Sequence, residues 1–165
     1  MIREFGTNEF LFLLRAAQWT VVLSLIAFVG GGLFGIVVAV LRTQPFAPLR
    51  WAMTGYIQLF QGTPLLMQLF LVFFGLPLLG VEVSPWLAAT VSLALYASAY
   101  LVEIWRGSVE AVPHGQWDAS ASLGMRYFAQ LRLVILPQAL RLAVPPTVGF
   151  LVQLVKSTAL ASIIG

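Results

Sequence analysis

The chain has 165 residues, of which 60% are hydrophobic and only 9% are charged. Soluble domains carry roughly 45–50% apolar and about 25% charged residues, so these few charges cannot cover a soluble surface and lipid must cover the apolar residues. The net charge of +3 comes from singly scattered basic residues, which excludes the basic patch that a nucleic-acid-binding protein needs. Because the sequence has no cysteine, disulfides, thiolate metal sites and cysteine nucleophiles are also excluded.

Long uncharged stretches predict an all-α, polytopic bundle of transmembrane helices. Residues 1–15 are mixed and are expected to lie at the membrane interface. The first apolar stretch, residues 16–41, exceeds the roughly 7–15 apolar residues of a signal peptide and is long enough for a span, which needs about 20. Gly31 and Gly35 within it are four apart. Two interpretations stay open: close approach to another helix, or the general frequency of glycine in membrane helices.

Three further apolar stretches follow. Residues 51–79 predict a short interfacial helix, a break at residues 62–64 that contains Pro64, and a span over residues 65–79. Residues 86–102 predict the third span. The fourth apolar stretch begins near Leu133, and its span is predicted to start either before or after Pro145. The chain therefore contains four predicted spans.

Arginine placement predicts the orientation. The short loop after the first span contains Arg42 and Arg50, the segment after the third contains three arginines, and the loop between the second and third spans contains no lysine or arginine. Short cytoplasmic loops are enriched in these residues. We therefore expect residues 103–132 in the cytoplasm and the N-terminus outside.

The polar segment 103–132 predicts a helix end followed by a short helix. Glu103 and Arg106 are three apart and share a helix face, and Pro113 and Gly115 stop that helix. A second helix is predicted to begin at Gln116, with Asp118 in its first turn, Arg126 towards its end and Gly124 ending or bending it. Its predicted apolar face consists of Trp117, Ala121, Met125 and Phe128. Such a helix either docks into a groove on another protein or lies flat on lipid headgroups.

This segment resembles the EAA loop of the permeases of ABC importers. The matching positions, at the family's spacing, are Asp118-Ala119-Ser120, Gly124, Val134 and Leu136-Pro137. Residues 60–66, which read Phe-Gln-Gly-Thr-Pro-Leu-Leu, are similar to the branch that imports polar amino acids, with Gln61 in place of the frequent arginine. Residues 103–107, 115–117 and 155–160 are also similar to that branch.

The resemblance implies a type I ABC importer permease: one transmembrane domain over residues 1–165, with a coupling loop at 103–132 and normally a fifth span, which we expect to be missing here. It implies a cytoplasmic ATPase that binds the ATP, a second permease subunit that is identical or paralogous, an external binding protein and a polar amino acid as substrate. The expected location is the bacterial inner membrane. No enzyme activity and no cofactor are expected in this chain, which has no phosphate-binding loop ending in Gly-Lys-Ser/Thr. The expected ATPase-coupling residues are Gly115, Gln116, Asp118, Ala119, Ser120 and Gly124.

Polar residues in the apolar stretches are the candidates for the substrate pathway: Gln61, Thr63, Gln153, Lys156 and Ser157. Lys156 either borders the pathway or snorkels from a helix end. An intramembrane enzyme is disfavoured because spans one to three contain no acidic residue, and the single histidine, His114, lies in the polar loop. No metal site is expected. A permease for another small solute and a non-transporting membrane scaffold remain the alternatives.

Overall fold

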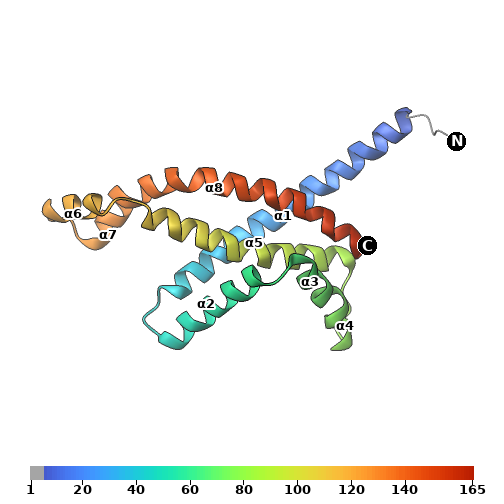
Figure 1. Cartoon of the computed structure of the whole chain (residues 1–165), viewed down its shortest axis with the longest axis horizontal. Helices are drawn as coiled ribbons and strands as arrows, with labels where there is room; N and C mark the ends of the chain where they lie inside the picture. Colours follow the sequence, from blue (N-terminus) through green and yellow to red (C-terminus); the bar gives the residue numbers. More distant parts are fainter. Residues whose placement is uncertain (1–5) are drawn as a thin grey trace.

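The computed structural model describes residues 6–165, and Figure 1 shows an elongated helical bundle with both ends of the described chain on the same side. Long helices alternate with short ones. In chain order the helices are α1 (Thr7–Arg42), α2 (Ala47–Gly62), α3 (Leu65–Phe70), α4 (Leu76–Leu78), α5 (Pro85–Glu110), α6 (His114–Ser122), α7 (Tyr127–Gln130) and α8 (Leu136–Ser157). Two π-helical turns (Leu71–Gly75 and Leu131–Ile135) precede α4 and α8, and a 3₁₀ segment (Thr158–Ile163) follows α8.

Helix α1 is longer than the predicted span. Its 36 residues extend about 54 Å at 1.5 Å per residue, well beyond a hydrocarbon core of about 30 Å. Residues 7–15, which are expected at the membrane interface, continue α1 without a break, and residues 1–5 lie outside the described part. The first half of α1 projects from the bundle (Figure 1), and its buried residues begin only at Leu23.

Helices α1 and α5 approach closely at the two glycines. A Cβ atom on Gly31 would lie 2.6 Å from the Ala97 Cβ and 2.7 Å from the Ala94 carbonyl oxygen. A Cβ atom on Gly35 would lie 3.2 Å from the Ser98 carbonyl oxygen. The prediction of close helix packing at these glycines is confirmed, and α1–α5 is the most extensive helix pair of the fold.

The predicted break in the second apolar stretch is also confirmed. Helix α2 ends at Gly62, and Thr63 adopts an extended conformation before α3 begins at Leu65. The chain bends by 107° between α2 and the segment Leu65–Leu78. In Figure 1, α3 and α4 turn away from the direction of α2.

The remaining two spans run beside each other, with α6 and α7 at one end (Figure 1). Helix α5 extends from Pro85 to Glu110, longer than predicted at both ends, and α8 continues through Pro145 and Pro146. The fourth span therefore starts before Pro145. Three helices in the described part are long and apolar enough to cross a membrane, or four if the bent pair is one span.

Candidate functional site

The chain leaves α5 through a short turn that fixes the position of α6. Helix α5 ends at Glu110, Val112 is buried, and Pro113 caps α6 by accepting a hydrogen bond from the Gln116 amide at 2.9 Å. Proline without an N–H fits a position just before a helix. The helix therefore begins at His114, two residues before the predicted start, and Asp118 lies past its first turn.

Gly124 ends α6 as predicted. Its φ of +74° lies in the left-handed region, which glycine adopts without the penalty that a Cβ brings. Because the chain turns here, the prediction of one continuous apolar face is wrong: Met125 follows the turn, and Phe128 belongs to α7. Arg126 is likewise outside α6, where it precedes α7 as its N-cap.

Trp117 anchors α6 to the bundle. Its side chain packs against a buried cluster of Val112, Ile135 and Ala139, and its ring stacks on Tyr127 with centroids 5.9 Å apart. The Gln138 amide donates to Gln116 Oε1 at 3.1 Å, which joins α8 to α6. The inward face of α6 is thus fixed by the helices on either side of it.

The outward face of α6 presents small and polar residues. Among the predicted coupling residues, five are exposed, whereas Ser120 is buried and donates to the Trp117 carbonyl at 2.9 Å. The exposed five are Gly115, Gln116, Asp118, Ala119 and Gly124. No large apolar side chain of α6 is exposed, so the helix lacks the broad apolar face of a helix that lies on lipid.

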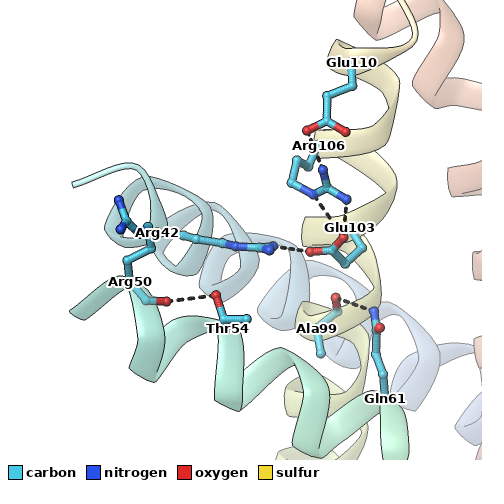
Figure 2. Close-up of polar contacts among 8 residues, drawn as sticks. All are labelled: Arg42, Arg50, Thr54, Gln61, Ala99, Glu103, Arg106 and Glu110. Atoms are coloured by element: carbon cyan, nitrogen blue, oxygen red, sulfur yellow. Dashed lines mark hydrogen bonds and ion pairs between the residues drawn. The ribbon is translucent and has the colours of Figure 1, made fainter. Parts of the chain in front are cut away.

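A network of ion pairs lies near the C-terminal end of α5. Figure 2 shows the Glu103 carboxylate between Arg106 on its own helix and Arg42 at the end of α1, with Arg106 also paired with Glu110. The predicted Glu103–Arg106 pair is confirmed, with contacts of 2.7 and 3.0 Å. Arg42 and Glu110 were missed: Glu110 lies one turn beyond Arg106, but Arg42 is 61 residues from Glu103.

Polar side chains of α2 bind the backbone of α5. The Tyr56 hydroxyl donates to the Leu95 carbonyl at 3.0 Å and contacts Ser98 Oγ at 2.6 Å. One turn further, Gln61 Nε2 donates to the Ala99 carbonyl at 3.1 Å (Figure 2). Gln61 thus has a hydrogen-bond partner inside the bundle.

The break itself encloses polar atoms beside an apolar cavity. Gln68, which is 7% exposed, donates through Nε2 to the Thr63 hydroxyl at 2.9 Å and to the Phe60 carbonyl at 2.9 Å. A cavity of about 380 Å³ lies between α2, α3 and α5, and its polar lining residues are Thr63, Gln68 and Ser92.

The predicted pathway residues form two groups. Gln61 and Thr63 lie at the end of α2, which packs mainly on α5 and α1. Ser157 is buried and donates to the Gln153 carbonyl at 2.9 Å, whereas the side chains of Gln153 and Lys156 are exposed on α8. No hydrogen bond joins the two groups within residues 6–165. These residues also contain no cluster of three acidic, histidine or cysteine residues that could hold a metal ion.

Comparison with known protein families shows to which family the chain belongs. Residues 31–165 match the family of binding-protein-dependent transport system inner membrane components. The chain belongs to this family. It is thus an ABC importer permease by descent, and the all-α polytopic fold and the resemblance drawn from residues 118–137 are confirmed.

Relatives of this permease are named for amino acids. It is 36% identical over 161 residues to the probable amino-acid ABC transporter permease protein YckA of Bacillus subtilis, covering 98% of this chain and 71% of the relative. It is 38% identical over 144 residues to the L-cystine transport system permease protein TcyB of the same organism, covering 87% of this chain and 62% of that relative. The chain therefore spans about two thirds of the length of these relatives.

A solved structure supports the fold over the whole chain. The crystal structure of an amino acid ABC transporter with histidines superposes with a TM-score of 0.88 at 31% identity, covering 100% of this chain and 78% of the other. A chain from a structure of the MetNI methionine ABC transporter superposes with a TM-score of 0.77 at 23% identity, covering 98% of this chain and 78% of that one, and shares the fold.

Proposed function

We propose that this permease is the membrane-spanning subunit of an ATP-driven importer of polar amino acids in the bacterial inner membrane. Two permease subunits, identical or paralogous, form the translocation pathway, and an external binding protein delivers the substrate. The amino-acid names of the relatives and the Phe60–Leu66 resemblance support this substrate class. The N-terminus lies outside, in agreement with the arginine excess around residues 103–132.

The outward face of α6 carries the proposal. Its residues are small and polar, Trp117 on the opposite side of α6 packs against the bundle, and the turn at Gly124 ends the helix. A protein cleft can contact such a face closely, whereas lipid would have no large apolar side chain within α6 to bury, since the exposed Leu123 lies beyond the end of the helix. We infer that the exposed coupling residues enter a cleft of a cytoplasmic ATPase, and that Ser120 acts inward by holding the helix in shape.

The coupling also requires a path from α6 into the spans. Two contacts provide it: Gln138 ties α6 to α8, and the Arg42–Glu103 pair ties α5 to α1. When the ATPase pair closes on ATP, the two α6 helices are displaced, and these contacts carry the displacement into three of the spans. ATP binding and hydrolysis remain with the partner subunit.

A co-purification experiment tests the docking surface. The Ala119→Lys variant places a long cation on the exposed face of α6, whereas Glu82→Lys places the same side chain in the exposed loop between α4 and α5. The cognate ATPase should co-purify with the wild-type chain and the Glu82→Lys variant but not with Ala119→Lys. Retention of the ATPase by Ala119→Lys contradicts the assignment of the docking face.

The substrate is tested separately. The reconstituted complex, with its binding protein, is assayed for ATP hydrolysis in the presence of single amino acids, with a sugar and a dipeptide as controls for other small solutes. Stimulation by a polar amino acid is the expected result. An intact complex that is stimulated only by another solute retains the permease assignment and overturns the substrate class, whereas a chain that assembles with no ATPase is a membrane scaffold.

A further inference from the structure

The α2–α3 break removes backbone hydrogen bonds in an apolar region. In a continuous helix the N–H of residue 64 would donate to the carbonyl of Phe60, but Pro64 has no N–H. Thr63 is extended (φ −107°, ψ 139°), so its own carbonyl also leaves the helical register. The carbonyl oxygens of Phe60 and Thr63 are therefore among those at this helix end that need donors from elsewhere, because unsatisfied carbonyls are costly where water is scarce.

The side chain of Gln68 supplies those donors. Its Nε2 lies 2.9 Å from the Phe60 carbonyl oxygen and 3.1 Å from the Thr63 carbonyl oxygen. The Thr63 hydroxyl, 2.9 Å away, is a third acceptor at the same nitrogen, since it donates its own hydrogen to the Leu59 carbonyl at 2.7 Å. The amide orientation follows from this environment, because the reversed side chain would point an oxygen at three acceptors.

The other end of the same amide is unpaired. Gln68 Oε1 is buried and has no hydrogen-bond partner among the described residues. A buried acceptor without a donor destabilises its surroundings, so the oxygen does not account for glutamine at this position. The donors on Nε2 do, since an aliphatic residue of the same length would leave the Phe60 and Thr63 carbonyls without them.

We propose that Gln68 is a positioning residue that replaces the donor removed by Pro64 and thereby sets the 107° bend between α2 and α3–α4. The bend places α3 against α5. It also lets the end of α2 stay in contact with α5, where Gln61 donates to the Ala99 carbonyl. Its importance for transport rests on the proposed function, whereas its control of the bend does not.

Two substitutions at Gln68 distinguish the effect of its hydrogen-bond donors from the effect of its side-chain volume. Gln68→Met keeps the length and apolar packing but removes both N–H groups. Gln68→Glu, neutral when buried, keeps one O–H donor and is expected to be intermediate. Gln58→Met is the matched control, because Gln58 lies exposed on α2, on the other side of the break, and makes no hydrogen bond within the described residues.

The bend is measured as a distance between spin labels at Ala52 on α2 and Leu78 on α4, both exposed, in assembled transporter diluted with unlabelled permease. From these positions the arms to the break are about 15 Å and about 20 Å at 1.5 Å per residue. Opening the bend by about 30° would lengthen the label distance by roughly 6 Å. We expect a longer or clearly broadened distance for Gln68→Met, a smaller change for Gln68→Glu and the wild-type distance for Gln58→Met.

An unchanged distance in Gln68→Met, in a complex that assembles normally, overturns the proposal. If Gln68→Met fails to assemble, Gln68→Glu decides, since a wild-type distribution there with one donor lost also contradicts the donor role. Uptake is measured on the same preparations. A changed distance with unchanged uptake retains the control of the bend and contradicts only its role in transport, whereas absence of uptake in wild type contradicts the proposed function alone.

Discussion

Substitution of Gly31 by alanine tests whether α1 and α5 are held together by backbone proximity. The added Cβ would lie 2.6 Å from the Ala97 Cβ and 2.7 Å from the Ala94 carbonyl oxygen, whereas carbon atoms in contact lie about 3.5–4.0 Å apart. Neither neighbouring atom can rotate away, because one is a Cβ and the other is backbone. The two helices must therefore separate by about 1 Å at this point.

The neighbouring glycines provide matched controls. An alanine Cβ at Gly30 would lie 3.8 Å from the Ala94 Cβ, and one at Gly32 would lie 3.7 Å from Cη2 of Trp105, both ordinary contacts. All three substitutions gain about 1 kcal/mol of helix propensity on the aqueous scale. Only Gly31→Ala also incurs an overpacking cost of about 1–3 kcal/mol, which is therefore the expected difference in stability between Gly31→Ala and Gly32→Ala.

The difference is measured as the thermal unfolding midpoint, Tm, of the purified permease in one detergent. At about 2–4 °C per kcal/mol for a chain of this size, Gly31→Ala should unfold several degrees below Gly32→Ala and Gly30→Ala. Equal Tm values for the three variants would refute the reasoning, because the close approach would then place no limit on residue 31.

Four further outcomes are expected. Arg42→Gln and Glu103→Gln should each lower Tm, and the double variant should be more stable than the sum of the two predicts by about 1 kcal/mol; additive effects would show that the pair makes no net contribution. Gly124→Leu meets a φ of +74°, which costs about 1–2 kcal/mol, and should uncouple ATP hydrolysis from uptake; normal uptake would contradict this. Lys156→Met should leave assembly intact and reduce uptake, whereas uptake at the original rate would identify Lys156 as a snorkelling anchor. A single cysteine at the exposed Ser122 should resist an impermeant reagent added outside intact cells, and ready labelling would reverse the orientation.

The sequence predicted those features that depend on the backbone properties of a single residue, such as a missing N–H or a positive φ. Pro64 predicted the break because it lacks an N–H, and Gly124 predicted the end of α6 because the turn needs a positive φ. Pro145 and Pro146 had no such effect: α8 continues through both. Its neighbours hold it in place, since Phe150 just beyond them stacks on Tyr100 of α5 with centroids 5.4 Å apart.

Features that depend on distant pairs could not be predicted. Arg42 was a loop residue until the fold placed it beside Glu103, 61 residues away. Gln68 was one more polar residue in an apolar stretch until its amide was found on the Phe60 carbonyl, eight residues back and across the break. A helix-spacing rule could not have paired Gln68 with Phe60, because the chain between them is not helical throughout. Segment 103–132, by contrast, was singled out by its polar residues and by its resemblance to the EAA loop, although the inward and outward faces of α6 were not predicted.

The kinds of contact that join the spans differ, and the difference has a physical consequence. Helix α2 is joined to α5 by hydrogen bonds from Tyr56 and Gln61 to backbone carbonyls, and such bonds lose strength steeply when donor and acceptor shift or tilt. Helix α8 packs on α5 through a buried apolar cluster that includes Leu154, through the ring stack of Tyr100 and Phe150, and through one long 3.3 Å bond from Trp105 to Thr147. Apolar surfaces are non-directional and tolerate sliding better than a set of aligned hydrogen bonds. Helix α8 is also the span that follows α6 along the chain. A displacement of α6 is therefore expected to make α8 slide along α5 more readily than it makes α2 slide along α5.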